Sequence, residues 1–355
     1  MDTLHIKAGR VACKMIRDGG LDFDRIAAYV GPAVGPRWLV AGGFDLTLLE
    51  NEILGQSRPL LLAGSSAGAW RFAAWALPDP VKSYRNFMDA YISMKYDNND
   101  TPRTIQLVIR NVIDAYIEDD AIPFALANKR YRLAIATARA RHIVAFGAKF
   151  LQGPGLAICF LLNAVNRSSL YRFFQRVVFY SGYRPPHFCI EDDFSGEAIP
   201  LVEPNFKAAV MASGAIPLVV SGFKNIYGAP NGIYRDGGLT DYHLNNRYVT
   251  RDDDIALLFH HQGRIIPGWL DKKLKYRRPS DSFLKNVLMV YPSEDLIQKF
   301  PGGKIPDRED FKIYVDDPKT RIKNWRRVVD LCAPLGEQFL ELVESKKIRH
   351  IVEEM

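Results

Sequence analysis

The chain has 355 residues, of which 48% are hydrophobic and 25% are charged, a composition typical of a globular protein with a sizeable core and not of a disordered chain. The net charge of +7 is compatible with an anionic partner, but 40 carboxylates stand against 47 basic residues, so solubility is the default explanation of this bias. The four scattered cysteines form no Cys-x-x-Cys pair, which excludes a metal site of that spacing and a small disulfide framework.

The sequence predicts neither a signal peptide nor a membrane span. Charged residues are spread through the first thirty positions and leave no apolar signal-peptide core. The most apolar stretch, residues 150–165, is interrupted by Gln152, by a Gly-Pro-Gly run and by Asn163. We therefore expect a cytoplasmic protein whose contact with a membrane is at most peripheral.

The first third of the chain alternates between predicted helices and buried strands. Apolar spacing, Gly and Pro punctuation and residue propensities place these elements. They are a helix over residues 21–31, a strand over residues 38–41, a helix over residues 44–54, a strand over residues 59–63 and a helix over residues 67–77. Such alternation predicts a mainly parallel sheet with helices packed on its faces, the α/β class.

The same patterns continue beyond residue 78. Strands are predicted over residues 132–138, 187–191, 255–260 and 287–291, and helices over residues 80–96, 103–117, 155–181, 204–213 and 318–347. No linker precedes the last ninety residues, so we expect residues 266–355 to form a C-terminal helical extension packed on the same domain.

A nucleophile turn is predicted at Ser66. Residues 64–68 read Gly-Ser-Ser-Ala-Gly, a Gly-x-Ser-x-Gly pattern between an apolar strand and a helix-forming segment. In such a turn a strained serine is exposed at the end of a strand, and small residues, here Gly64 and Gly68, let the two elements approach closely. The following helix directs free N–H groups toward the site. A chance Gly/Ser turn is the alternative, and the strand–helix context favours the functional interpretation.

Two further turns can supply the other parts of an acyl-transfer site. Gly42 and Gly43 follow the predicted strand over residues 38–41 and can present N–H groups to an oxyanion. Asp236, followed by Gly237 and Gly238, offers a carboxylate on an exposed turn that can act as the base for a serine hydroxyl. Each also fits an ordinary turn.

Histidines offer a second possible base. His243 lies seven residues after Asp236 and can complete a Ser-His-Asp arrangement, although lone histidines are more often structural. His260 and His261 follow an apolar run and lack a third ligand in the sequence, so no metal and no cofactor is predicted.

Taken together, these segments resemble the patatin-like phospholipase family. The resemblance rests on Gly42-Gly43 before a helix, on residues 64–68, on Asp236-Gly237-Gly238, and on residues 212–217, which read Ala-Ser-Gly-Ala-Ile-Pro and resemble the stretch that precedes the Asp-Gly-Gly turn in that family. Four weak motifs in the family's order are more specific than any one of them.

The resemblance implies a three-layer α/β/α sandwich over residues 22–265. It also implies a Ser-Asp dyad in which Ser66 attacks an ester carbonyl and Asp236 accepts the proton and later activates water. Gly42 and Gly43 would help to form the oxyanion hole. The implied substrates are acyl lipids, commonly phospholipids or lysophospholipids.

One position departs from the family's pattern. The family's first glycine loop is usually longer in glycine and carries Lys or Arg two residues past its last glycine, whereas Asp45 stands there in this chain. A carboxylate beside an oxyanion hole would disfavour the developing negative charge unless it points away or is paired.

Residues 150–180 suggest contact with lipid. Apolar residues between Leu156 and Val177, together with Arg167, Arg172 and Arg176, fit a basic amphipathic helix that covers the lipid entrance and lies against a membrane surface. A core helix with solvated arginines fits the same pattern.

Three functions therefore stay open at this level. The first is a lipid acyl hydrolase with a Ser66–Asp236 dyad. The second is a small-ester or thioester hydrolase that uses Ser66 with His243, and the third is a catalytically weak lipid-binding protein marked by Asp45. No recognition motif accompanies the positive charge, so no nucleic-acid partner is expected.

Overall fold

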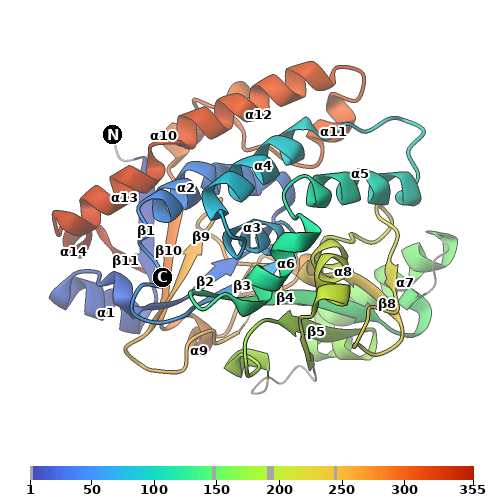
Figure 1. The fold of residues 1–355 in the computed structure, drawn as a ribbon, viewed down its shortest axis with the longest axis horizontal. Coiled ribbons are helices and arrows are strands. Elements are labelled where there is room, and N and C mark those ends of the chain that lie inside the picture. Colours follow the sequence, from blue (N-terminus) through green and yellow to red (C-terminus); the bar gives the residue numbers. More distant parts are fainter. Residues whose placement is uncertain (1–2, 146–148, 190–195, 244–245) are drawn as a thin grey trace.

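A large mixed sheet, mostly parallel, forms the centre of the molecule (Figure 1). The computed structural model describes residues 3–145, 149–189, 196–243 and 246–355. Within them the sheet has eleven strands in the order β11-β1-β10-β9-β2-β3-β4-β5-β6, with β8 pairing β4 and β7. The strands are β1 Leu4–Ala8, β2 Ile26–Gly31, β3 Leu60–Ser65, β4 Tyr131–Ala140, β5 Phe174–Tyr180, β6 Glu197–Pro200, β7 Phe223–Lys224, β8 Ile233–Asp236, β9 Ile255–Phe259, β10 Val287–Pro292 and β11 Glu353–Glu354.

Helices cover both faces of this sheet. The main core lies under α2, α3, α4, α8, α12 and α13 on one face, and smaller apolar clusters lie under α7, α9 and short 3₁₀ segments on the other. The α-helices are α1 Arg10–Gly19, α2 Gly42–Glu50, α3 Ala67–Trp75, α4 Pro80–Ser93, α5 Pro102–Asp114, α6 Ile122–Ala127, α7 Lys149–Val165, α8 Glu203–Ser213, α9 Asp281–Leu284, α10 Glu294–Ile297, α11 Asp310–Ile313, α12 Pro318–Cys332, α13 Leu335–Glu344 and α14 Ile348–Ile351. The predicted α/β class is confirmed.

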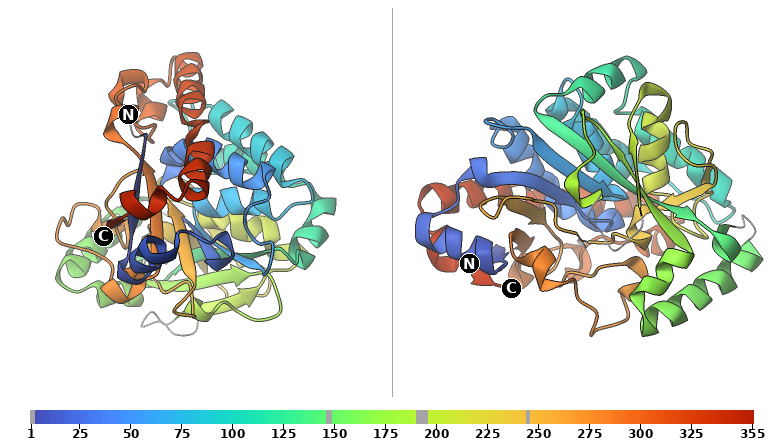
Figure 2. Two further views of the ribbon diagram at one scale, coloured as in Figure 1. Left: turned by 90° about the vertical axis from the view of Figure 1, so that its left-hand side faces the viewer. Right: turned by 90° about the horizontal axis from the view of Figure 1, so that it is seen from below.

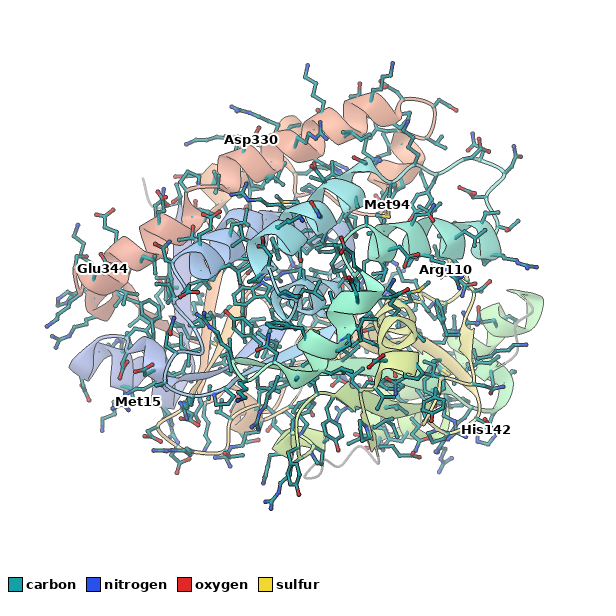
Figure 3. The ribbon with its side chains drawn as sticks, in the orientation of Figure 1. Met15, Met94, Arg110, His142, Asp330 and Glu344 are labelled. Atoms are coloured by element: carbon teal, nitrogen blue, oxygen red, sulfur yellow. The ribbon has the colours of Figure 1, made fainter. Side chains whose placement is uncertain are left out.

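The last ninety residues contribute to the sheet as well as to its cover. β10 is a central strand beside β9, and β11 pairs with β1, so both ends of the described chain lie at the same edge of the sheet (Figure 2). Trp325, Val328 and Phe339 of α12 and α13 are buried in the main core, whereas Asp330 and Glu344 lie on the outer side of these helices (Figure 3).

Two strands lie end to end along one edge of β4. β3 runs parallel to β4 as far as the pair Ser65–Ala136, and the antiparallel β8 takes over at the next position with the pair Asp236–Thr137. The end of β3 and the end of β8 therefore meet beside adjacent residues of β4. This register determines where the candidate site forms.

Several sequence predictions are confirmed, and others are wrong. The predicted strands at β3, β4, β9 and β10 and the predicted helices at α2, α3, α4, α5, α8 and α12–α13 are present. Residues 26–31, predicted as part of a helix, are the buried strand β2, and residues 38–41, predicted as a strand, belong to a 3₁₀ helix, η2 Gly35–Ala41. The predicted strand over 187–191 begins as a short 3₁₀ helix, His187–Cys189, and residues 190 and 191 lie outside the described part.

The helix predicted over residues 155–181 is also only partly right. α7 ends at Val165, the 3₁₀ helix η5 Arg167–Arg172 follows, and β5 starts at Phe174 inside the sheet. Among the described residues, no helix is both long and apolar enough to cross a bilayer.

Candidate active site

Ser66 occupies a strained turn between β3 and α3. Its φ of 53° and ψ of −124° lie in a region that side chains rarely adopt, and such strain persists only where the surrounding structure enforces it. The backbone N–H of Ser66 donates to Ser213 Oγ over 2.9 Å, and that hydroxyl donates in turn to the carbonyl of Ala136 over 2.7 Å. α8 and β4 therefore both hold the turn in place.

Small residues allow the turn to be this tight. A Cβ added to Gly68 would lie 2.0 Å from the carbonyl oxygen of Gly31, and one added to Gly64 would lie 2.6 Å from the backbone of Ala69. No larger residue fits at either position, so the start of α3 packs directly on the end of β2. The two motif glycines thus act through close packing.

Asp236 meets Ser66 at the junction of β3 and β8. The Ser66 hydroxyl donates to Asp236 Oδ2 over 2.9 Å, and the other carboxylate oxygen, Oδ1, accepts the Gly238 N–H over 2.7 Å. A Cβ on Gly237 would lie 2.2 Å from the Ala136 carbonyl oxygen, which explains the small residue there. The carboxylate is oriented before any substrate arrives, with one oxygen directed at the nucleophile.

The environment of Asp236 tunes its acidity toward neutral pH. Burial raises the pKa of this carboxyl to about 6, although the hydrogen bonds from Gly238 and Ser66 and the charges of Arg308 and Lys272 lower it. A carboxylate with a pKa near the working pH accepts a proton better than an ordinary surface aspartate.

The structure does not bring Gly42 and Gly43 to this site. They form the first turn of α2, where a Cβ on Gly43 would lie 2.5 Å from the Cys332 carbonyl oxygen and one on Gly42 would lie 3.1 Å from the sulfur of Met88. The predicted strand before them belongs to η2, whose first residues line the pocket beside Ser66, whereas Gly42 and Gly43 follow its last residue and do not line the pocket. The sequence analysis thus expected the oxyanion loop after residues 38–41, at the end of η2 and not at its start.

The loop that reaches the pocket follows β2. Ala33, Val34, Gly35 and Arg37 line the pocket beside Ser66. Gly35 has a φ of +56° and opens η2, so its N–H has no partner within that helix. Arg37 stands two residues past Gly35, which is the place where the resemblance implies a cation.

Asp45 lies away from the pocket in a buried network. It is fully buried, and both of its oxygens accept from the Arg71 guanidinium over 2.8 Å. The hydroxyls of Tyr29 and Tyr84 donate to it over 2.6 and 2.5 Å. The carboxylate is thus paired and cannot oppose an oxyanion, which removes the objection raised by the sequence.

His243 does not contact Ser66 and forms a cluster with two other buried histidines. Its ring centroid lies 4.2 Å from that of His260 and 5.6 Å from that of His261, and the three have ligand atoms within 4.8 Å of one another. Burial lowers the pKa of all three rings, that of His260 to about 4, so they are neutral. The sequence did not show that His243 would join the other two.

The hydrogen bonds of this cluster limit its use as a metal site. His243 Nδ1 accepts the Ile266 N–H over 3.1 Å, so its proton is on Nε2, the atom that faces no partner. His260 Nδ1 donates to the Gln262 carbonyl over 2.5 Å and leaves Nε2 as a free acceptor. A three-histidine metal site would require His243 to give up its bond to Ile266. That the chain binds no metal stays a prediction.

The rest of the pocket is built from both apolar and basic side chains. It is lined by Ala33, Val34, Gly35, Arg37, Ser66, Ile216, Pro217, Asp236, Leu239, Tyr242, Trp269, Lys272 and Arg308. Residues 212–217, identified from the sequence as a motif, therefore contribute Ser213 to the turn and Ile216 and Pro217 to the wall.

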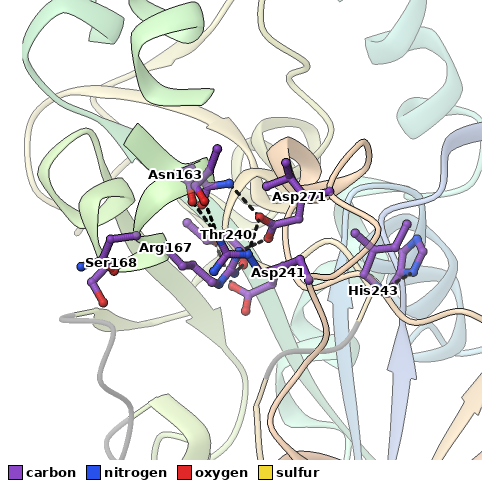
Figure 4. Close-up of polar contacts among 12 residues, drawn as sticks. Asn163, Arg167, Ser168, Thr240, Asp241, His243 and Asp271 are labelled. Carbon is purple, nitrogen blue, oxygen red and sulfur yellow. Dashed lines mark hydrogen bonds and ion pairs between the residues drawn. The ribbon is translucent and has the colours of Figure 1, made fainter. Parts of the chain in front are cut away.

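A buried polar network holds one wall of the pocket (Figure 4). Asp271, between Trp269 and Lys272, accepts from Asn163 of α7 over 2.7 Å and pairs with Arg167. Arg167 also donates to the Thr240 carbonyl over 2.8 Å. α7 and the pocket wall are thereby one connected unit.

This geometry places a serine hydroxyl, an oriented carboxylate and the free N–H groups at the start of α3 at one end of a partly apolar pocket. Such an arrangement can carry out acyl transfer through a covalent intermediate. No protein-family model and no curated protein matches this chain.

Proposed function

We propose that the protein is a serine acyl hydrolase that cleaves acyl esters of lipids with a Ser66–Asp236 dyad. The observation that carries the proposal is the 2.9 Å hydrogen bond from Ser66 Oγ to Asp236 Oδ2, made by a serine held at positive φ in a pocket. Because Asp236 reaches the hydroxyl directly, no histidine is needed between them.

The reaction follows from this contact. Ser66 Oγ attacks the ester carbonyl carbon while its proton passes to Asp236, and the tetrahedral intermediate collapses with transfer of that proton to the leaving alcohol. Asp236 then takes a proton from water, which attacks the acyl-Ser66 ester, and the fatty acid is released as that proton returns to Ser66 Oγ. The Gly238 N–H keeps the carboxylate oriented through both steps.

The oxyanion is stabilised by backbone donors on both sides of Ser66. Ala67 is the first residue of α3, so its N–H lacks an intrahelical partner and lies at the positive end of the helix. The Gly35 N–H is the second donor, from the loop after β2. These two groups take the role that the sequence analysis gave to Gly42 and Gly43.

The lipid character of the substrate is supported by an exposed apolar stripe on α7. Ile158, Leu161, Leu162 and Val165 follow helical spacing, and Leu161 and Val165 are 64% and 88% exposed. The side chain of Gln152 accepts from the Leu218 N–H over 3.0 Å, next to the pocket residue Pro217, so the N-terminal part of α7 adjoins the pocket wall. A soluble metabolite would not require such a stripe.

Exposed cations adjoin the far end of the same helix. Tyr276 Oη donates to the Ala164 carbonyl over 2.7 Å, and the neighbouring Lys273, Lys275 and Arg278 are exposed. Apolar side chains with flanking cations favour an anionic membrane surface. Peripheral contact through residues 150–180 therefore remains part of the proposal, and a cytoplasmic location stays a prediction.

The test is hydrolysis of a phospholipid and lysophospholipid panel by the wild-type protein and by Ser66→Ala. We expect fatty acid release and labelling by a fluorophosphonate probe in the wild type and loss of both in Ser66→Ala, since no other hydroxyl occupies the turn position. Equal activity of the two proteins would remove the proposal.

Two further variants separate the dyad from the alternative with histidine. Asp236→Asn should lower kcat by at least ~10³-fold because the base is lost. His243→Ala should retain acyl-enzyme turnover, since His243 contacts Tyr242 and the other histidines and not Ser66. The opposite pattern would assign the base to His243.

A further inference from the structure

We infer that Arg37, Lys272 and Arg308 form a subsite for the phosphate group of an anionic acyl-ester substrate. The inference rests on the proposed function, because it assigns a ligand to the same pocket. It selects substrates that carry a phosphomonoester on the alcohol side, such as acylglycerol phosphates, over neutral acylglycerols.

The three cations come from three separate segments and converge on the catalytic pair. Arg37 belongs to η2, Lys272 follows the 3₁₀ helix η8 Trp269–Asp271, and Arg308 precedes α11, and all three line the pocket with Ser66 and Asp236. Convergence of basic side chains from distant segments is costly unless an anion offsets their repulsion.

The contacts of Lys272 illustrate this cost. Its Nζ lies 4.3 Å from the ring centroid of Tyr242 and 5.7 Å from that of Trp269, between two aromatic faces. Burial, together with the positive charges of Arg308 and Arg37, lowers the pKa of this ammonium group to about 7, although the carboxylate of Asp236 raises it. A bound anion would restore its positive charge.

The protein neutralises the cluster only in part. Arg37 Nη2 lies 3.6 Å from Asp307 Oδ2, which is a long ion pair. Within the described part of the chain, neither Lys272 nor Arg308 forms an ion pair, and Asp236 is the carboxylate that lines the pocket with them. Even when Asp307 and Asp236 are both ionised, the three cations outnumber the two carboxylates, and the net positive charge is complementary to phosphate.

The apolar part of the lining defines the rest of the substrate. Ile216, Pro217 and Leu239 lie in the same pocket as the cations, so an acyl chain and a phosphate can both be accommodated about the ester that Ser66 attacks. A guanidinium group binds two phosphate oxygens at once. A terminal phosphate leaves more oxygens accessible than one esterified to choline, so the subsite favours the terminal phosphate.

The test compares two substrates with the same short acyl chain, 1-acylglycerol 3-phosphate and 1-acylglycerol, both below their aggregation limit so that membrane binding plays no part. We expect the wild type to have the higher kcat/KM for the phosphate ester. Lys272→Gln and Arg308→Gln should each reduce that preference about tenfold. Lys299→Gln, an exposed lysine outside the pocket, is the matched control and should retain it.

Binding without catalysis keeps this inference separate from the proposed function. Glycerol 3-phosphate should bind Ser66→Ala in calorimetry, glycerol should not, and Arg308→Gln in the Ser66→Ala background should abolish the heat. Binding together with no hydrolysis of any ester would support the subsite and remove the hydrolase proposal. An unchanged preference for the phosphate ester in both pocket variants would overturn the subsite. Binding of inorganic phosphate as tight as that of glycerol 3-phosphate, together with no preference between the two ester substrates, would also overturn it.

Discussion

At the scale of single residues, the site depends on how two oxygens of one carboxylate are used. Asp236 Oδ1 is held by the Gly238 N–H, and Oδ2 accepts from Ser66. In a Ser-His-Asp triad the aspartate orients a histidine, whereas Asp236 contacts the serine hydroxyl directly and is the base in the proposed dyad. Burial raises the pKa of this carboxyl and makes it a better proton acceptor, whereas the Gly238 hydrogen bond that orients it lowers the pKa, so basicity and orientation have separate structural origins.

The pH dependence of activity should report this carboxyl. The base acts in its ionised form and its pKa is raised to about 6, so kcat/KM should be constant above that pH and fall about tenfold per unit below it. With an ordinary aspartate as the base, kcat/KM would stay unchanged down to about pH 4. A pH profile with a soluble ester checks this, and a profile flat between pH 5 and 7 would contradict it.

At the scale of elements, the structure shows why some segments were predicted and others were not. β2 is buried on both faces, so its apolar residues do not alternate, and its alanines fit helical spacing equally well. η2 contains the short apolar run of a strand, but Gly35 and Pro36 begin it as a 3₁₀ helix. β8 has four residues, too few for a pattern, although the Asp-Gly-Gly turn after it was recognised.

Site residues divide in the same way. Ser66 and Asp236 could be identified because their turns require glycines at fixed offsets. Lys272, Arg308 and Ser213 could not be assigned roles, because their contacts depend on which distant segments the fold brings together. Asp45 was expected beside the oxyanion hole for the same reason, because the sequence does not show that Arg71, its partner on another helix, would lie next to it.

For α7, we predict that the double variant Leu161→Asn, Val165→Asn binds vesicles containing phosphatidylserine about tenfold more weakly. Two exposed apolar side chains then no longer enter the membrane interface. Sedimentation with vesicles measures the change. A double replacement of Ile313 and Ile351, exposed residues of α11 and α14, is the control and should bind as the wild type does.

At the scale of the whole molecule, one buried charge pair joins β2 to α2, α3 and α4, the helices on the face of the sheet that carries the main core. Asp45 of α2 and Arg71 of α3 are bonded to each other, to Tyr29 of β2 and to Tyr84 of α4. Asp45 and Arg71 thus neutralise each other, and this pair connects the sheet to its covering helices behind the Ser66 turn.

Removing one member of this pair should destabilise the protein strongly. Arg71→Met leaves Asp45 buried and unpaired and is expected to lower the free energy of unfolding by about 3–5 kcal/mol. Arg85→Met breaks the exposed pair with Glu50 and should cost less than about 1 kcal/mol. Urea denaturation of both variants provides the comparison, and equal midpoints would show that the buried pair has no special role.

The end-to-end arrangement of β3 and β8 along β4 has a consequence for how activity arises during folding. Ser66 and Asp236 are 170 positions apart in the chain, and they meet only when both strands have docked in register on β4. Contacts so distant in sequence form late, because loop closure is unfavourable until other contacts support it. During refolding, we therefore expect the helical signal to return before Ser66 reacts with a fluorophosphonate probe, because a partly folded chain lacks the Ser66–Asp236 contact.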